Sequence, residues 1–211
     1  MIPNPTDFSI TDLYRKVSTD PEAEIIRNLR SKLSNGTFTW VSFVYFAALE
    51  MAGWYRGKPD PRHRDAISDS DLVLADGIAF RLLHFAFFHP EIPGWNILFR
   101  YPRYSRLAVA NLNGTDFVPK VLESFRDGNV RVVLYGTTPE TLPKAVAHVR
   151  ERFGLETAGS HGYAPFPETL LAGDVPVILL VGLGTPRQEK WISDNRSMLE
   201  KRGNILVFGV G

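Results

Sequence analysis

From about residue 37 onward the chain alternates between short apolar runs and amphipathic segments. Runs rich in β-branched, aromatic and aliphatic residues predict strands at residues 37–44, 72–75, 131–135, 175–181 and 205–208. Apolar residues at helical spacing predict the intervening helices, at residues 45–55, 77–88, 117–125, 142–153 and 186–201. Because no hairpin signals interrupt this order, we expect a single α/β domain with a doubly wound, mostly parallel, Rossmann-like sheet and helices on both faces.

Two regions interrupt the alternation. Residues 1–36 are polar and helical in pattern, and we expect them to pack on the α/β domain of residues 37–211. Residues 84–112 form a long insertion without a clear period, in which aromatic side chains are interleaved with Arg100, Arg103 and Arg106. This composition suits contact with an anionic membrane surface, and it equally suits packing on the protein's own core.

The overall charge narrows the choice of partners. With 24 basic and 23 acidic side chains the net charge is +1, so we expect no nucleic-acid partner. The longest apolar runs, residues 41–49 and 175–183, are shorter than the roughly 20 residues of a membrane-spanning helix. The N-terminus lacks the pattern of a signal peptide. We therefore expect a cytoplasmic protein that touches the inner face of the membrane peripherally, if at all.

Neither a metal nor a cofactor is expected. The chain has no cysteine, which excludes disulfides and cysteine-based zinc sites. His84, His89 and His161 do not lie at the spacing of a metal-binding cluster.

Glycines follow three of the predicted strands. They are Gly136, then Gly182 and Gly184, and then Gly209 and Gly211. Glycine allows a ligand to approach the backbone closely, and the N-terminus of a following helix attracts anions, so this arrangement suits a diphosphate. In the segment GLGTPR, Arg187 stands where the third glycine of a dinucleotide fingerprint belongs, which disfavours a nicotinamide enzyme.

Three polar residues near these strand ends have two interpretations each. Thr185, Pro186 and Gln188 match a helix N-cap, a first-turn proline and a capping-box glutamine, so Gln188 is either a cap or a ligand. Asp76 follows the strand at 72–75 and either caps the next helix or acts as a general base. Asp116 is similarly ambiguous. From the residues alone, the capping role is favoured for Gln188 and Asp76.

An ordered set of segments resembles the WecG/TagA/CpsF family of glycosyltransferases. The segments are LVLADGIAF, NGTDF, VVLYGTTPET, SHGYAPF, VGLGTPRQEKWISDN and FGVG. The resemblance spans residues 37–211 and implies an inverting, metal-independent transferase without a cofactor. Its donor would be a UDP-sugar carrying N-acetylmannosamine, its uronate, glucose or glucuronate. Its acceptor would be a polyprenyl-diphosphate-linked saccharide of cell-wall, cell-surface or exopolysaccharide biosynthesis, and relatives self-associate, so a homo-oligomer is expected.

The resemblance favours a role in the site over helix capping alone for the polar residues near the strand ends. Asp76 matches the family's proposed catalytic base, Gln188 matches a donor-pocket glutamine that can also cap, and Gly114, Thr115 and Asp116 match a segment beside the sugar. With the strand-end glycines, the expected site has Asp76 as the base and the substrate-binding residues Ser42, Tyr45, Gly77, Asn111, Gly114, Thr115, Asp116, Gly136, Gly182, Gly184, Arg187 and Gln188.

The chain also departs from the family pattern. Ser42 and Tyr45 stand for the usual Thr and Asn, and Asn111 stands for the usual Arg, which Arg103 or Arg106 could replace. Relatives continue past GVG with a basic, membrane-docking segment that contributes arginines, so we expect weak or absent transfer by this chain alone. The second hypothesis is therefore a non-catalytic nucleotide-sugar-binding or scaffold protein of the same fold.

Overall fold

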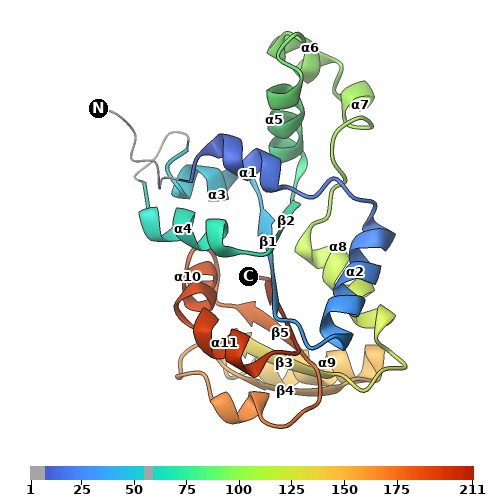
Figure 1. Ribbon diagram of the computed structural model, residues 1–211, viewed down its shortest axis with the longest axis vertical. Helices are drawn as coiled ribbons and strands as arrows, with labels where there is room; N and C mark the ends of the chain where they lie inside the picture. Colours follow the sequence, from blue (N-terminus) through green and yellow to red (C-terminus); the bar gives the residue numbers. More distant parts are fainter. Residues whose placement is uncertain (1–7, 55–58) are drawn as a thin grey trace.

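The computed structural model describes residues 8–54 and 59–211, which form one open sheet of parallel strands (Figure 1). The strand order is β2-β1-β6-β5-β3-β4, and every paired neighbour is parallel. The predicted doubly wound α/β fold is thus confirmed. The strands are β1 (Thr39–Val44), β2 (Leu72–Ala75), β3 (Arg131–Gly136), β4 (Glu156–Ser160), β5 (Val177–Gly182) and β6 (Ile205–Gly209).

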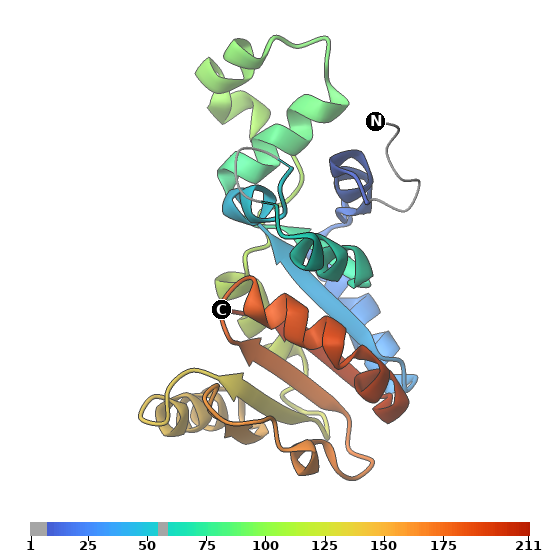
Figure 2. The ribbon, with the colours of Figure 1, turned by 90° about the vertical axis from the view of Figure 1, so that its left-hand side faces the viewer.

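Helices cover both faces of the sheet (Figure 2). Within the described residues they are α1 (Ile10–Lys16), α2 (Glu22–Ser34), α3 (Phe46–Met51), α4 (Pro61–Asp69), α5 (Ile78–Phe88), α6 (Gly94–Phe99), α7 (Tyr101–Tyr104), α8 (Gly114–Ser124), α9 (Leu142–Phe153), α10 (Arg187–Asp194), α11 (Arg196–Arg202) and the short 3₁₀ helix η1 (Glu168–Leu171).

Alternation along the strands explains why both faces are covered. Side chains of a strand point to opposite faces in turn. In β5, Ile178 packs in the cluster formed with α2, α8 and α9, whereas its neighbour Leu179 packs with α4, α10 and α11. Both side chains are fully buried. A nearly continuous apolar run such as VILLV is therefore what a parallel strand between two helical layers requires.

Several predicted elements need correction. The predicted helix at 186–201 is divided at Asn195 into α10 and α11, and the predicted helix at 45–55 is observed as α3. Neither α4 nor the edge strand β4 was predicted. Tyr55, at the end of one predicted helix, and residues 1–7 lie outside the described residues.

The segment before the sheet packs on it through α1 and α2. Leu13 and Tyr14 of α1 lie in the hydrophobic cluster around β2, α3 and α5. Leu29 and Leu33 of α2 lie in the cluster on the α8–α9 face of the sheet. These buried apolar side chains attach both helices to the domain.

The insertion forms an arm, residues 78–108, which projects from the sheet as α5, α6 and α7 (Figures 1 and 2). Its small core contains Phe85, Ile97 and Tyr104. Arg81 fixes its base, because the guanidinium donates hydrogen bonds to the carbonyl oxygens of Ser105, at 2.8 Å, and of Val109, at 2.5 Å. The arm also exposes the large apolar side chains Phe88, Trp95, Leu98, Phe99, Tyr101 and Leu107.

None of the helices in the described ranges is both long and apolar enough to cross a membrane.

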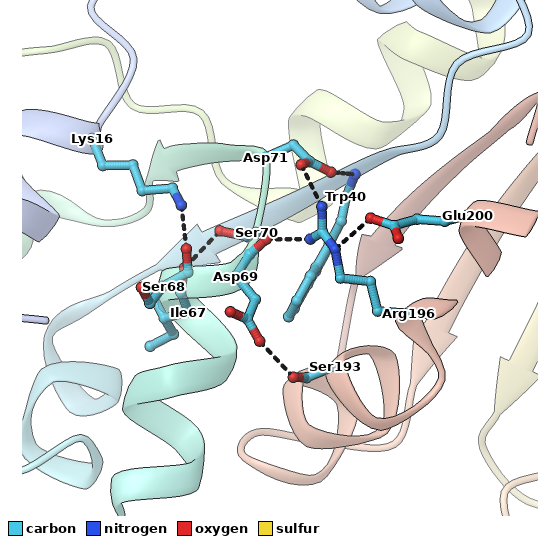
Figure 3. A network of polar contacts seen from close by, with 10 residues as sticks. All are labelled: Lys16, Trp40, Ile67, Ser68, Asp69, Ser70, Asp71, Ser193, Arg196 and Glu200. Atoms are coloured by element: carbon cyan, nitrogen blue, oxygen red, sulfur yellow. Dashed lines mark hydrogen bonds and ion pairs between the residues drawn. The ribbon is translucent and has the colours of Figure 1, made fainter. Parts of the chain in front are cut away.

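A polar network holds the helices to the amino ends of β1 and β2 (Figure 3). The Asp71 carboxylate accepts hydrogen bonds from the Trp40 backbone N–H, at 2.8 Å, and from Nη2 of Arg196, at 2.9 Å. Arg196 also donates to the carbonyl oxygen of Asp69, and its Nε donates to the Glu200 carboxylate at 2.7 Å. Consequently α11 is bonded to the last residue of α4 and to Asp71, and through Asp71 it is linked to β1.

Candidate active site at the carboxyl ends of the strands

A cavity of about 180 Å³ lies at the opposite, carboxyl end of the sheet. Open parallel sheets bind their ligands at this end, where loops and helix N-termini converge. Segments that follow β1, β2, β5 and β6 meet there, although they are far apart in the sequence. The cavity is lined by Phe43, Tyr45, Asp76, Gly114, Thr115, Thr185, Gln188, Gly209, Val210 and Gly211.

Asp76 is placed at the tip of β2 by its backbone, whose N–H donates to the carbonyl oxygen of Val44 at 2.9 Å. Helix α5 begins at Ile78, and its N-cap residue is Gly77, with no side-chain cap. Gly77 has φ +77°, a conformation that favours glycine. The capping role of Asp76, which the residues alone favoured, is therefore wrong.

The surroundings of Asp76 make its carboxylate a stronger base. Burial raises the pKa of Asp76, and the negative charge of Asp116 raises it further. No described residue donates a hydrogen bond to this carboxylate, so nothing nearby stabilises the ionised form by that means. A half-buried carboxylate with a raised pKa in a cavity is suited to accepting a proton.

Asn111 and Asn113 arrange the segment opposite Asp76. The side-chain oxygen of Asn111 accepts a hydrogen bond from the Gly77 N–H at 2.8 Å. Asn113 is the N-cap of α8: its side-chain oxygen accepts from the Asp116 N–H at 2.9 Å, while its amide donates to the Asp116 carboxylate at 2.8 Å. The uncertainty over Asp116 is thus resolved in structural terms, because it belongs to the first turn of α8 and completes its cap.

A second cavity, of about 560 Å³, adjoins the first. Thr115 lines both cavities, whereas Asn111 and Asp116 line only the second, together with the basic side chains of Lys120 and Arg152. Thr115, in the first turn of α8, is therefore shared by the walls of the two cavities.

Gln188 points into the first cavity and does not cap its helix. Helix α10 begins at Arg187 without a side-chain cap, so the predicted capping by Thr185 and Gln188 is wrong. The Gln188 amide nitrogen donates to Oε1 of Glu189 at 3.0 Å, and its oxygen accepts from the Gly211 N–H at 2.9 Å. A Cβ on Gly209 would lie 3.0 Å from that amide nitrogen, so the glycine at the end of β6 allows the close approach.

Behind Gln188 lies a buried polar cluster. Oε1 of Glu189 also accepts a hydrogen bond from the Thr185 hydroxyl at 3.1 Å, but Oε2 has no hydrogen-bond partner and lies 4.0 Å from Nδ1 of the fully buried His63. Burial raises the pKa of Glu189 and lowers the pKa of His63 to about 4. Lys190, ion-paired with Asp60, adds to the lowering for His63. His63 is therefore neutral at pH 7.

Several expected site residues lie elsewhere. Ser42 is buried in β1 with an unpartnered hydroxyl and does not line the cavity. A Cβ on Gly136 would lie 2.3 Å from the carbonyl oxygen of Gly182, so Gly136 is required by the contact between β3 and β5. Gly184, whose φ is +77°, shapes the turn into α10, and Arg187 is exposed. None of these four positions borders the cavity of Asp76.

The two arginines expected to replace the family's cation do not reach this cavity either. Arg103 and Arg106 line a separate hollow on the arm together with Pro102 and Leu107.

Three cavity residues were not expected as ligands. Phe43 precedes the last residue of β1, and its ring lies 3.4 Å from where a Cβ on Gly114 would be. The position of Phe43 near the carboxyl end of a predicted strand could have indicated that it lines the site. Thr185 was predicted to be a helix N-cap. Val210 was not predicted to be a ligand, because the prediction at this strand end concerned the glycines on either side of it.

No group of three or more His, Asp or Glu side chains in the described residues is arranged to hold a metal ion. The sequence model described as "Glycosyl transferase WecG/TagA/CpsF family" matches residues 13–211. No curated protein matches the chain.

Proposed function

Because the chain belongs to the WecG/TagA/CpsF family of glycosyltransferases, which implies sugar transfer in cell-surface polysaccharide synthesis, we propose that it uses a UDP-sugar donor and a polyprenyl-diphosphate-linked acceptor. The sugar is a hexose type, such as N-acetylmannosamine, its uronate, glucose or glucuronate. The observation that carries the proposal is Asp76, a half-buried carboxylate with a raised pKa in a cavity lined by strand-end glycines.

In the proposed reaction an acceptor hydroxyl attacks the anomeric carbon of the donor sugar from the face opposite the diphosphate. As the new C–O bond forms, Asp76 takes the hydroxyl proton, and the bond between the anomeric carbon and the diphosphate oxygen breaks. UDP leaves with that electron pair, and the configuration at the anomeric carbon is inverted. The raised pKa of Asp76 supports this role, because a base works best when its pKa lies nearer the working pH.

The two adjoining cavities support a donor that extends past Thr115. The first cavity, of about 180 Å³, is smaller than the ~300–1,000 Å³ of most small-molecule sites. The second, of about 560 Å³, adds space beside Thr115, and its wall carries both signs of charge: Lys120, which is ion-paired with Glu22, and Arg152, together with Asp116 and Glu123. Gln188 is held by Glu189 and the Gly211 backbone, so its amide is fixed in the wall of the first cavity.

The acceptor is borne by a lipid, so the enzyme works peripherally on the cytoplasmic face of the membrane. The exposed apolar side chains of the arm support this placement. A homo-oligomer remains part of the proposal.

A thermal-shift screen tests the donor directly. UDP-sugars at about 100 times the dissociation constant add about 2.7 kcal/mol of apparent stability, and we expect this shift without added magnesium. NAD serves as the control and is expected to give no shift. Equal shifts with NAD, or none with any UDP-sugar, would contradict the proposed donor. Binding of a UDP-sugar without any transfer would select the second hypothesis, a non-catalytic binding or scaffold protein.

A further inference from the structure

An apolar groove of about 450 Å³ lies between α3, α5 and α6. Every side chain that the structure describes in its wall is hydrocarbon, including Phe46 of α3, Ile78, Leu82 and Ala86 of α5, and Ile97 and Leu98 of α6. Small-molecule sites of this size usually place a few polar groups among apolar ones. The described residues of the wall offer no side-chain hydrogen bond, and their chemistry therefore suits a hydrocarbon ligand.

Helix α5 carries apolar side chains on two faces; one is packed on α1, and the other is partly covered by the core of the arm, against which Leu82 and Ala86 pack. Phe80 and His84 pack on the ring of Tyr14 in α1. Ile78, Leu82 and Ala86 recur at every fourth residue and form the opposite stripe, which faces the groove. A stripe of this kind needs an apolar partner, since contiguous exposed apolar surface marks an interaction site.

The groove and the Asp76 cavity are lined by neighbouring residues of the same two segments. Phe46, in the groove, directly follows Tyr45, in the cavity, and Ile78 lies two residues after Asp76. A ligand with a polar head at Asp76 and an apolar tail can therefore occupy both spaces at once.

The charge along the arm favours a tail attached to an anion. Residues 92–115 contain Arg100, Arg103 and Arg106 and no aspartate or glutamate. Phosphate groups are attracted by clustered arginines, and here the cluster lies on the arm outside the groove, with Arg103 and Arg106 in a separate hollow. The side chains of Trp95 and Phe99 are 65% and 80% exposed and extend the apolar surface beyond the groove.

Resting on the proposed function, we propose that this groove binds the isoprenoid chain of the acceptor and so delivers the acceptor hydroxyl to Asp76. The occupant is a prenyl diphosphate, as opposed to a second copy of the protein.

Photolabelling with a benzophenone-bearing farnesyl diphosphate tests the proposal without requiring sugar transfer. We expect labelled peptides from residues 78–88 and 94–99, and we expect unlabelled farnesyl diphosphate to suppress the labelling. Labelling confined to other segments would overturn the proposal.

Two leucines give a matched pair of variants. Leu98 and Leu107 are 67% and 66% exposed and both lie on the arm, but only Leu98 lines the groove. Leu98→Asp is expected to reduce labelling about tenfold, whereas Leu107→Asp, which places its charge beside Arg103 and Arg106 outside the groove, is expected to reduce it much less. Equal labelling of the two variants would overturn the proposal. Ala79→Trp, at an exposed position in the wall, fills the groove without adding charge and is expected to reduce labelling similarly.

Two further measurements separate the alternatives. Analytical sedimentation measures whether the protein is a dimer and whether Leu98→Asp dissociates it. A dimer that this variant dissociates would overturn the proposal, because a second copy of the protein would then cover the groove. UDP-sugar thermal shifts are expected to be unchanged in Leu98→Asp. Transfer without groove labelling removes this inference alone, whereas groove labelling without any UDP-sugar shift supports the groove and contradicts the proposed donor.

Discussion

The two ends of the sheet differ in how their charged side chains are bonded, although each end also has buried polar atoms without a hydrogen-bond partner, such as Nε1 of Trp40 at the amino end. At the amino end, Asp71 and Arg196 bond each other and the backbone, and join α11 to β1 and to the α4–β2 connection. At the carboxyl end, the Asp76 carboxylate receives no hydrogen bond from the described residues, and Oε2 of Glu189 is buried without a partner. Satisfied polar groups stabilise a fold, whereas unsatisfied buried ones cost free energy. The comparison predicts that the amino-end network contributes stability over a wide pH range, whereas the carboxyl end carries the reactive carboxylate and the buried groups that make stability depend on pH.

The largest expected effect comes from His63, behind the carboxyl-end cavity. Its pKa is lowered to about 4 in the folded protein by burial, so the unfolded chain binds a proton first as the pH falls below about 6.5. Stability is therefore lost between pH 6.5 and pH 4, by as much as about 3 kcal/mol. Urea unfolding at both pH values measures the loss.

His63→Phe is the control for this pH dependence, because it keeps a ring of similar shape but does not titrate. The variant should lose less stability than the wild type over the same pH interval. Equal losses would show that other groups, such as Asp60 or Glu189, cause the pH dependence, and would remove His63 from the comparison.

Breaking the amino-end network has the next largest effect. Arg196→Ala removes hydrogen bonds to Asp71, Asp69 and Glu200 and is expected to cost about 2 kcal/mol. In a chain of this size that corresponds to a fall in Tm of about 4–8 °C. Below the transition, UDP-sugar binding should be unchanged. Weaker UDP-sugar binding by folded Arg196→Ala would show that the amino-end network also affects the site at the carboxyl end.

Lys120→Ala provides the comparison for that stability loss. Lys120 forms an exposed ion pair with Glu22, and such pairs contribute at most about 1 kcal/mol. A loss of stability in Lys120→Ala as large as that in Arg196→Ala would mean that the amino-end network contributes no more than an exposed ion pair does.

A smaller effect is expected from Gln188. Gln188→Ala removes a fixed amide from the cavity wall and should weaken UDP-sugar binding about five- to tenfold, the equivalent of one hydrogen bond at about 1 kcal/mol. Calorimetric titration measures this change. Arg187→Ala is the matched control, since the neighbouring side chain is exposed and does not line the cavity. A greater loss of UDP-sugar affinity in Arg187→Ala than in Gln188→Ala would show that the donor does not bind in this cavity.

The smallest expected effect is a gain in stability. Because the folded state raises the pKa of Asp76 above 3.8, ionisation of Asp76 is disfavoured in the fold and lowers stability above that pH. Asp76→Asn should therefore stabilise the protein slightly at pH 7. The gain should disappear below pH 3.8, where the carboxyl group is protonated in both states. A loss of stability at pH 7 would contradict the raised pKa.

The parallel sheet was predictable because its central strands are continuous apolar runs such as VILLV, buried on both faces. The edge strand β4 was missed because its sequence, ETAGS, contains one buried residue, Thr157. Helix α4 was missed for a similar reason, since its buried side chains include only Ala66 and Ile67 among apolar residues. Tertiary contacts define both elements, and local pattern does not.

The site was predictable in part. Asp76 and Tyr45 directly follow strands, Gln188 lies in the first turn of α10, and the structure brings the three together in one cavity. Gly136 has the same sequence signature, but it is explained by its contact with Gly182. Glycine serves both close ligand approach and close backbone packing, so sequence alone does not separate these roles.

The central claim is that Asp76 removes the acceptor proton during sugar transfer. Its most direct test is the rate of transfer from a UDP-sugar to a prenyl-diphosphate-linked saccharide, measured with folded wild type, Asp76→Asn and Arg196→Ala at one temperature below all three transitions. If wild-type transfer is detected, Asp76→Asn should be slower by a factor of about 10²–10⁴, and Arg196→Ala should match the wild type. A wild-type rate in Asp76→Asn would contradict the account.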